Sequence, residues 1–248
     1  MTDLPLTVPH DFRIIAHRGA SGYAPENTLA AFRLAAQMGV REVELDIQYS
    51  MDRELVVIHD ENLDRYGFPD CRVAEMTLAE LQTLDMGRWF DDGRFAGERL
   101  ATLDEILTAF GDTFVYHAEI KVPADGLARR VLDCLDNHGV LGEAIITSFD
   151  FDAAAEVVAL TQRQRVGWLV REDEFIIENV ERAAAAGFFQ FCPRVYDMSE
   201  RNVAEARRHV AEVRGHGVRN VDDLVQAVRA KCDGATINWP DWLMHEPG

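Results

Sequence analysis

Short apolar runs alternate with amphipathic segments along most of the chain, and this alternation constrains the fold more than any other feature. The runs have the length and composition of buried strands, while the segments between them carry apolar residues at helical spacing. Strands that alternate with helices in this way lie parallel in one sheet. The expected strands are residues 12–19, 42–48, 113–121, 144–149, 165–170, 188–193, 213–218 and 233–238.

About eight such units in a chain of 248 residues predict a closed (β/α)8 barrel, the TIM barrel. The main alternative is a doubly wound open sheet, but no G-x-G-x-x-G turn follows the first strand. A stretch rich in Gly and charge interrupts the alternation after the second strand, and we interpret it as a small insertion over roughly residues 52–100. Because no Pro/Gly linker divides the chain, we expect a single catalytic domain over residues 1–248.

The formal net charge of −18 argues against a nucleic-acid partner and against stable association with an anionic membrane. It does not exclude a phosphate substrate, because a local site can be cationic in an acidic protein. The four cysteines are widely separated and form no C-x-x-C pair, which argues against zinc or dithiol chemistry. Residues 1–12 lack the pattern of a signal peptide and no apolar run could span a bilayer, so we expect a cytoplasmic protein.

The segment 42–48 alternates polar and apolar side chains with a period of two, as a strand does. In a barrel the outer face of each strand is covered by helices, and the apolar side chains of this segment suit that face. The polar side chains are therefore expected to face the barrel axis, with the later ones nearest the mouth at the carboxyl ends of the strands. They are Glu42, Glu44, Asp46 and Gln48.

The strand at 113–121 repeats this inversion, with His117, Glu119 and Lys121 expected to face the axis. Carboxylates that converge in a mouth of low dielectric constant repel one another unless protons or a cation relieve the repulsion. A hard divalent cation with oxygen ligands, Mg²⁺ or Ca²⁺, would do this. The alternative is a salt-bridged cluster in which Lys121 and Arg41 neutralise the acids, and alternation alone favours neither reading.

Two histidines stand at the carboxyl ends of extended runs, where the active sites of TIM barrels form. His17 ends the first strand and precedes Arg18, and the run at 55–60 ends in His59-Asp60. Two imidazoles can supply an acid–base pair near neutral pH, and a guanidinium suits phosphate. A lone histidine at a strand end is more often structural, so it is the combination with the acids and Lys121 that indicates cleavage of a phosphate ester.

The chain resembles the glycerophosphodiester phosphodiesterase family in stretches that follow in order along nearly its whole length. These are residues 16–32, 43–65, 118–121 and 148–150, with a weaker match at 233–240. The compound pattern HRG…PENT…ExD…HD…ExK is far more specific than any one fragment. The resemblance implies a TIM barrel with a small insertion after the second strand, which hydrolyses glycerophosphodiesters to glycerol 3-phosphate and an alcohol.

The resemblance also implies site residues. It implies a divalent metal, Mg²⁺ or Ca²⁺, held by three acids, an acid–base pair of histidines, and phosphate contacts from two cationic side chains. In this order the matching residues are Glu44, Asp46 and Glu119, then His17 and His59, then Arg18 and Lys121.

Four further residues are candidate pocket walls, each with a structural alternative. Glu26 and Asn27 either reach the site or start a helix. Phe149 and Trp239 either line the substrate pocket or only pack. By contrast, we expect His117 to be a buried, hydrogen-bonded core residue.

The departures from the family pattern are expected to lie outside the metal and proton-transfer residues. Ile237-Asn238 replaces a final Thr-Asp, and His216 or Gly217 stands where a tryptophan is common. These departures bear on the walls of the alcohol pocket and on substrate breadth.

Three functions remain open for the sequence alone. The first is the phosphodiesterase with a small-molecule glycerophosphodiester substrate. The second is a phospholipase-like or other phosphodiesterase of the same barrel type, and the third is a barrel that binds phosphoesters without turnover. The sequence leaves open the head group, the metal, which histidine is the acid, whether water or a neighbouring hydroxyl attacks, and the oligomeric state.

Overall fold

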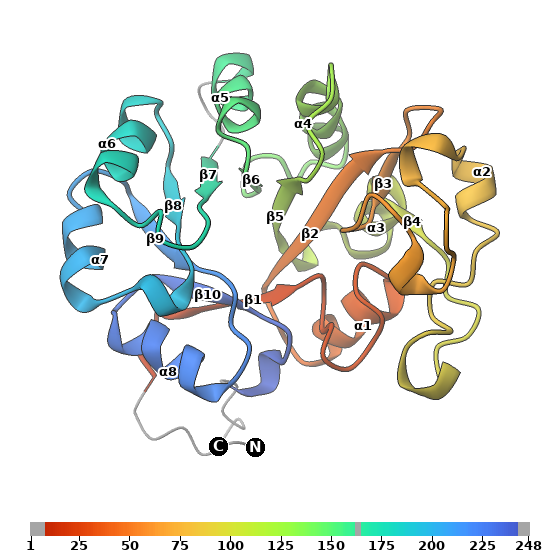
Figure 1. The fold of residues 1–248 in the computed structure, drawn as a ribbon, viewed down its shortest axis with the longest axis horizontal. Coiled ribbons are helices and arrows are strands. Elements are labelled where there is room, and N and C mark those ends of the chain that lie inside the picture. Colours follow the sequence, from red (N-terminus) through yellow and green to blue (C-terminus); the bar gives the residue numbers. More distant parts are fainter. Residues whose placement is uncertain (1–7, 162–164, 243–248) are drawn as a thin grey trace.

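The computed structural model describes residues 8–161 and 165–242, and its central feature is a closed barrel of parallel strands (Figure 1). The first barrel strand pairs in parallel with both the second and the last, which closes the sheet on itself. The predicted (β/α)8 barrel is confirmed. In barrel order the strands are β1 (Arg13–His17), β10 (Gly234–Ile237), β9 (Glu212–Gly215), β8 (Gln190–Cys192), β7 (Arg165–Leu169), β6 (Ile145–Ser148), β5 (Val115–Ile120) and β2 (Glu42–Tyr49).

Helices surround this barrel on its outer side (Figure 1). Many of them begin at a Ser, Thr, Asp or Asn whose side chain accepts a hydrogen bond from a backbone N–H of the first turn, as Thr28 does from Ala31. Gly39 takes a positive φ of 77° just beyond the first helix, where the expected stop signal lies. The helices are α1 (Leu29–Gln37), α3 (Leu103–Phe110), α4 (Leu127–Asn137), α5 (Phe151–Leu160), α6 (Ile177–Ala185), α7 (Glu200–Ala206) and α8 (Val221–Arg229).

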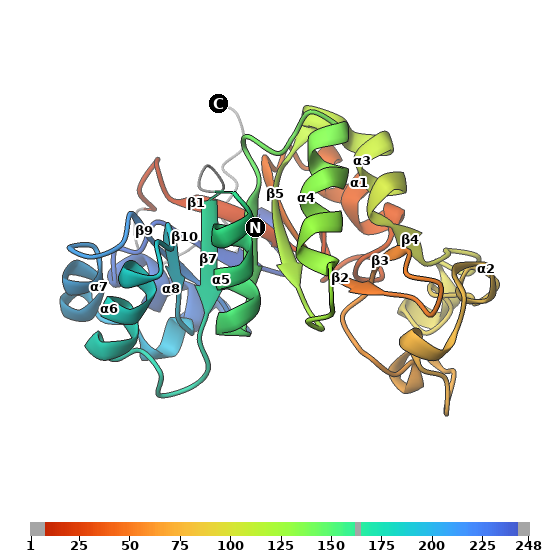
Figure 2. The same cartoon turned by 90° about the horizontal axis from the view of Figure 1, so that it is seen from above.

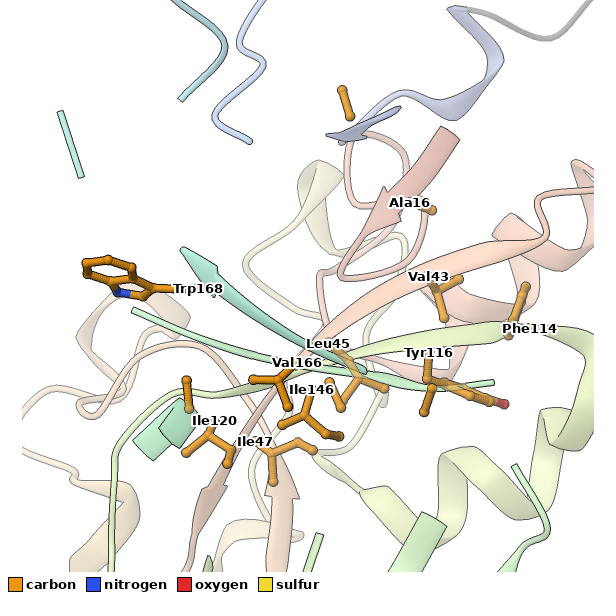
Figure 3. Packing of buried hydrophobic residues seen from close by; sticks show 14 of the residues in the cluster. Ala16, Val43, Leu45, Ile47, Phe114, Tyr116, Ile120, Ile146, Val166 and Trp168 are labelled. Atoms are coloured by element: carbon orange, nitrogen blue, oxygen red, sulfur yellow. The ribbon is translucent and has the colours of Figure 1, made fainter. Parts of the chain in front are cut away.

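The apolar side chains of β2 and β5 pack outward against this helical layer, as the alternation predicted (Figure 3). Val43, Leu45 and Ile47 are fully buried in the main apolar cluster, and Tyr116 joins them from β5. The opposite side chains of the two strands point into the barrel. His117 is fully buried there and its Nε2 lies 2.8 Å from Glu42 Oε2, which confirms the prediction of a hydrogen-bonded core histidine.

The chain leaves the barrel after β2 and returns at α3. β3 (Leu55–Val57) runs antiparallel to β2, and the two-residue β4 (Ala101–Thr102) runs antiparallel to β3. Between them the segment that contains α2 (Leu78–Leu81) packs around an apolar cluster of its own and lies to one side of the barrel (Figure 2). The sequence had no signal for β4, because two residues are too few for a period to be visible.

Within this insertion the aromatic residues serve to anchor the loop. Met86 is buried in the insertion's own apolar cluster, and Trp89 packs against that cluster while donating a hydrogen bond of 2.7 Å to the carbonyl of Met86. The assignment of residues 1–248 to one domain stays a prediction. None of the helices in residues 8–161 and 165–242 is both long and apolar enough to cross a membrane.

The central position of Leu45 gives a test of this core. Replacing Leu45 by alanine removes a fully buried side chain at the β2–β5 pair. We expect the free energy of unfolding to fall by about 2–5 kcal/mol, measured by urea denaturation. Met51→Ala is the control, because Met51 is 53% exposed and its loss should change the same quantity by less than about 0.5 kcal/mol. Equal effects of the two substitutions would contradict the described packing.

Candidate active site

Three carboxylates meet at the carboxyl-end mouth of the barrel. Glu44 and Asp46 come from β2 and Glu119 from β5, and the parallel register pairs Asp46 directly with Glu119. Each offers an oxygen such that all three oxygens lie within 4.8 Å of one another. The three side chains belong to residues that are 3%, 0% and 5% exposed, respectively. The inverted polarity of β2 therefore brings acids together inside the protein.

Their electrostatics fit a site for a hard divalent cation. Burial, and then the charge of Asp46, raises the pKa of Glu44 well above its usual range and raises the pKa of Glu119 to about 7. Burial opposes ionisation of Asp46 too, but Arg18 and Lys121 outweigh it and lower its net pKa. Glu44 Oε1 and Asp46 Oδ1 are buried without a hydrogen-bond donor in the described part of the chain. Carboxylate oxygens of this kind are the ligands that Mg²⁺ and Ca²⁺ prefer.

Two cationic side chains partly neutralise the acids. Arg18 Nε lies 2.9 Å from Asp46 Oδ2, and Lys121 Nζ lies 2.8 Å from Glu119 Oε1 and 3.5 Å from Asp46 Oδ1. The suggestion that Arg41 shares this task is wrong. Arg41 is exposed and directly precedes β2, at the end of the strand opposite the mouth, so its side chain cannot reach the acids.

Glu26 and Asn27 lie beside the acids and not at the start of the helix, which Thr28 caps. The guanidinium of Arg18 donates to both carboxylate oxygens of Glu26 at 3.0 Å. Asn27 Nδ2 donates to Asp46 Oδ2 at 2.8 Å. Both residues therefore hold the groups that face the cavity, and neither is among the residues that line it.

His17 faces the cavity with its ring oriented by the last barrel strand. Its Nδ1 lies 2.7 Å from Asn238 Oδ1, and because an amide oxygen only accepts, Nδ1 carries the proton. Nε2 is then free as an acceptor, 3.8 Å from Glu44 Oε2. Desolvation in the cavity, followed by the charge of Arg18, lowers the pKa of His17 to about 3. Asn238 is not itself one of the proposed metal or proton-transfer residues, but it contacts one of them.

His59 has a carboxylate partner where His17 has an amide. His59 Nδ1 lies 2.5 Å from Asp60 Oδ1, and the other oxygen of Asp60 accepts from Arg65 Nε at 2.8 Å. Gln48, at the axis-facing end of β2, donates to the carbonyls of Ile58 and Asp60 at 3.1 Å and holds this segment against the barrel. Burial lowers the pKa of His59, while Asp46 and Asp60 oppose that shift.

These side chains open onto one cavity of about 320 Å³. A larger hollow of about 840 Å³ lies between α1 and the tip of the insertion, away from all of these groups. Phe149 lines the smaller cavity and packs edge-on against His216, with ring centroids 5.3 Å apart. Trp239 instead stacks on Trp242 at 4.6 Å. The lining residues include His17, Arg18, Glu44, His59, Glu119, Lys121, Phe149, Leu169, Arg194, Arg214, His216, Val218, Arg219, Thr236 and Asn238.

Sequence reasoning did not single out Asp60, Arg194 or Arg214 for the site, and it named Asn238 only as a departure from the family pattern. Asp60 had a usable signal, because it directly follows a histidine at a strand end. Asn238 had one too, because it ends the last barrel strand, where active-site residues gather. The two arginines had none beyond their positions shortly after β8 and near the end of β9.

A closed (β/α)8 barrel with buried carboxylates, two histidines and cations around one mouth defines an enzyme of the phosphate-ester-cleaving class. Residues 17–242 match the model of the glycerophosphoryl diester phosphodiesterase family. The chain belongs to this family and is a phosphoric diester hydrolase of the glycerophosphodiester phosphodiesterase type.

Relatives of known sequence and structure agree along nearly the full length. A glycerophosphodiester phosphodiesterase of Caldanaerobacter subterraneus subsp. tengcongensis is 30% identical over 236 residues, which cover 94% of this chain and 96% of the relative. The structure of a glycerophosphodiester phosphodiesterase from Agrobacterium tumefaciens str. C58 has a TM-score of 0.79 at 27% identity, covering 94% of this chain and 98% of that one. An Oleispira antarctica phosphodiesterase in complex with the product sn-glycerol-3-phosphate has a TM-score of 0.83 at 25% identity, covering 95% of each chain.

The raised pKa values of the acids predict how stability depends on pH when EDTA removes divalent cations. Glu44 and Glu119 retain protons in the folded state that the unfolded chain releases near pH 4.5. The stability from these retained protons is lost as pH rises from about 4.5 through the folded pKa, which for Glu119 lies at about 7. The buried histidines have lowered pKa values, and they act in the opposite sense until the imidazoles of the unfolded chain have lost their protons, at about pH 7.5. The contribution of the acids is therefore measured by comparing a variant with the wild type at each pH, since both contain the same histidines.

Glu119→Gln tests this assignment because glutamine cannot ionise. In EDTA the free energy of unfolding of the variant should rise relative to that of the wild type as pH increases from about 5 to 8, as measured by urea denaturation. Glu156→Gln on the exposed face of α5 is the control and should follow the wild type over this range. A Glu119→Gln curve parallel to that of the control would show that this acid does not carry the pH dependence.

Proposed function

We propose that this chain hydrolyses glycerophosphodiesters to glycerol 3-phosphate and an alcohol, with a divalent metal, Mg²⁺ or Ca²⁺, and with two histidines as acid and base. One observation carries the proposal: three buried carboxylates converge beside a cavity that is lined by two of them, by both imidazoles, and by Arg18 and Lys121. The small-molecule products follow from the family and from the glycerol 3-phosphate that a relative of similar fold holds.

Glu44, Asp46 and Glu119 would hold the metal, since their oxygens converge and two of them lack donors. A metal bound there would polarise a phosphate oxygen and offset negative charge that develops on the phosphoryl group. Lys121, whose ammonium group faces the cavity, would neutralise part of the same charge. Arg18 would contribute from a fixed position, because Glu26 and Asp46 hold its guanidinium.

The two histidines differ in the partner that orients each ring. Asn238 keeps the proton of His17 on Nδ1, so Nε2 can accept a proton from the attacking water. Asp60 stabilises a proton on His59, so His59 can give one to the departing alcohol oxygen. We propose His17 as the base because its partner is a neutral amide. We propose His59 as the acid because its partner is a charged carboxylate.

The size and polarity of the cavity favour a small water-soluble diester over a phospholipid. A volume of about 320 Å³ is at the lower end of ordinary ligand pockets. Most of the residues that line it are charged or polar, so long acyl chains would find few apolar side chains there. A panel of glycerophosphocholine, glycerophosphoethanolamine, a phospholipid and bis(p-nitrophenyl) phosphate, assayed with Mg²⁺ or Ca²⁺, tests the proposal. Turnover of the phospholipid alone would favour a lipase-like enzyme, and binding without turnover would favour a non-catalytic barrel.

Removal of either imidazole should abolish most of the turnover. His17→Ala and His59→Ala are each expected to lower kcat for a glycerophosphodiester by about 10²–10⁴-fold, because a positioned acid or base contributes on that order. His209→Ala, at an exposed position after α7, is the matched control and should keep wild-type kcat. Far-ultraviolet circular dichroism checks that each variant folds. Near wild-type kcat in either site variant would remove that histidine from the mechanism.

Metal binding should be visible without any assay of turnover. In EDTA we expect activity to disappear, and added Mg²⁺ or Ca²⁺ should raise both activity and Tm. At a metal concentration of about 100 times Kd the stabilisation is about 2.7 kcal/mol, because only the folded state binds. Glu119→Gln should lose most of this rise in Tm, whereas the exposed Glu156→Gln should retain it. Full activity after exhaustive chelation would rule out the metal.

A further inference from the structure

We propose that the preferred substrate carries an anionic group, a phosphate or a carboxylate, on its alcohol half, and that Arg194 and Arg214 bind this group. The inference rests on the proposed diester hydrolysis and adds the class of head group. Water would attack phosphorus as the bond from phosphorus to the alcohol oxygen breaks. One proton of the water passes to the alcohol and the other is released.

The cavity has the opposite sign of charge to the chain around it. The protein has 43 acidic and 25 basic residues, yet arginine and lysine outnumber acids among the residues that line the cavity. The acidic lining residues are Glu44 and Glu119, both of them in the proposed metal site. The basic lining residues are Arg18, Lys121, Arg194, Arg214 and Arg219.

Three of these five cations already have a carboxylate partner. Arg18 pairs with Asp46 and Glu26, and Lys121 pairs with Glu119. Arg219 donates to Asp223 at 2.9 Å on the rim. For Arg194 and Arg214 no ion pair exists within residues 8–161 and 165–242. They are therefore the cations that remain available to a ligand.

Arg214 supplies the strongest evidence. It is 1% exposed, and its Nη1 donates to Thr236 Oγ1 at 2.5 Å. Its Nε and Nη2 are buried and have no nitrogen or oxygen acceptor among the described residues, and its other polar neighbour is the thiol of Cys192. Glu42 lies close enough for its charge to be felt but makes no ion pair with it. Because an unsatisfied buried guanidinium is costly, an anionic acceptor that enters the cavity would be bound favourably.

Arg194 continues this cationic surface toward the rim. It follows β8 and forms an isolated parallel bridge with His216, which follows β9. Its Nη1 donates to the hydroxyl of Tyr196, and its Nε is buried without a partner. Asp197 lies near enough to act through its charge but not to form an ion pair. Arg194 thus has donors left for a ligand.

The two arginines lie across the barrel from the acids. β8 and β9 are separated from β2 and β5 by at least two strands in either direction around the sheet, and Figure 1 shows them on opposite sides of the barrel. A diester whose phosphate sits at Glu44 and Glu119 can extend one substituent across the cavity to Arg194 and Arg214. We assign that position to the alcohol half, so the charge on this half decides how well the substrate fits.

The aromatic side chain of this cavity does not suit a quaternary ammonium head group. Such a group binds over the face of an aromatic ring. Two cations already flank the ring of Phe149, with Lys121 Nζ 5.4 Å and Arg171 Cζ 5.5 Å from the ring centroid. A choline group there would be repelled by both charges, so the same features that favour an anion act against a cation.

The experiment compares diesters that share the glycerol phosphate half. The alcohol halves are choline, glycerol, glycerol phosphate and glyceric acid, and kcat/KM is measured for cleavage of the diester bond with metal present. We expect kcat/KM to be at least tenfold higher for the glycerol phosphate or glyceric acid diester than for the glycerol diester. The choline diester should be at least tenfold lower than the glycerol diester. The two anionic substrates separate a preference for phosphate from one for carboxylate.

Arginine variants show whether this preference arises from the assigned residues. In Arg194→Gln and Arg214→Gln the ratio of kcat/KM for the anionic diester to that for the glycerol diester should fall at least fivefold. If Arg214→Gln does not fold because Arg214 is buried, the ratio measured for Arg194→Gln still tests the proposal. Arg130→Gln, whose side chain is 51% exposed on α4, is the matched control and should keep the wild-type ratio.

Two kinds of result would overturn the inference. Equal kcat/KM for all four diesters, or an unchanged ratio in folded Arg194→Gln, would leave the proposed hydrolysis standing and reject the anionic head group. Cleavage of none of the four diesters in the presence of Mg²⁺ or Ca²⁺ would instead reject the proposed hydrolysis itself, together with the inference.

Discussion

The repulsion among Glu44, Asp46 and Glu119 is the constraint on which the rest of the site depends. Parallel pairing of β2 with β5 holds the three carboxylates within 4.8 Å of one another, away from bulk water. Charges of one sign at this distance in a medium of low dielectric constant must be neutralised by protons, by a metal or by nearby cations. Arg18 and Lys121 do part of this, while burial and then the charge of Asp46 still raise the pKa values of Glu44 and Glu119.

The need to neutralise these carboxylates also accounts for ion pairs between the insertion and the barrel. Glu26 accepts from Arg18 of the barrel and from Arg65 of the insertion, and Arg65 also donates to Asp60 beside His59. Charged contacts thus run without a break from the carboxylates on β2 to the second histidine. The insertion is therefore part of the proposed catalytic geometry, since it sets the position of one imidazole through an ion pair.

Much of the fold and of the site was predictable, because both follow from local patterns. The strands and helices have periods that are visible over a few residues. The alternation of acidic with apolar residues in β2 predicts that the acids share one face of the strand. The contact between His17 and Asn238 was not predictable from spacing, because 221 residues separate them in the chain. The assignment of Arg41 to the acids failed for a related reason. Proximity in sequence placed it next to β2, but at the end of the strand away from the mouth.

The sequence by itself determined the class of fold, the family and the residue types that meet at the mouth. Alternation and composition suffice for these, because they depend on which face each side chain takes relative to its own backbone. Only the tertiary structure decided which cations already have partners and which do not. Arg194 and Arg214 resemble the other cationic residues in sequence, and they differ because closure of the barrel places carboxylates of other strands within reach of Arg18 and Lys121 but not of these two. Ion pairing between distant segments depends on distances that only the closed barrel sets.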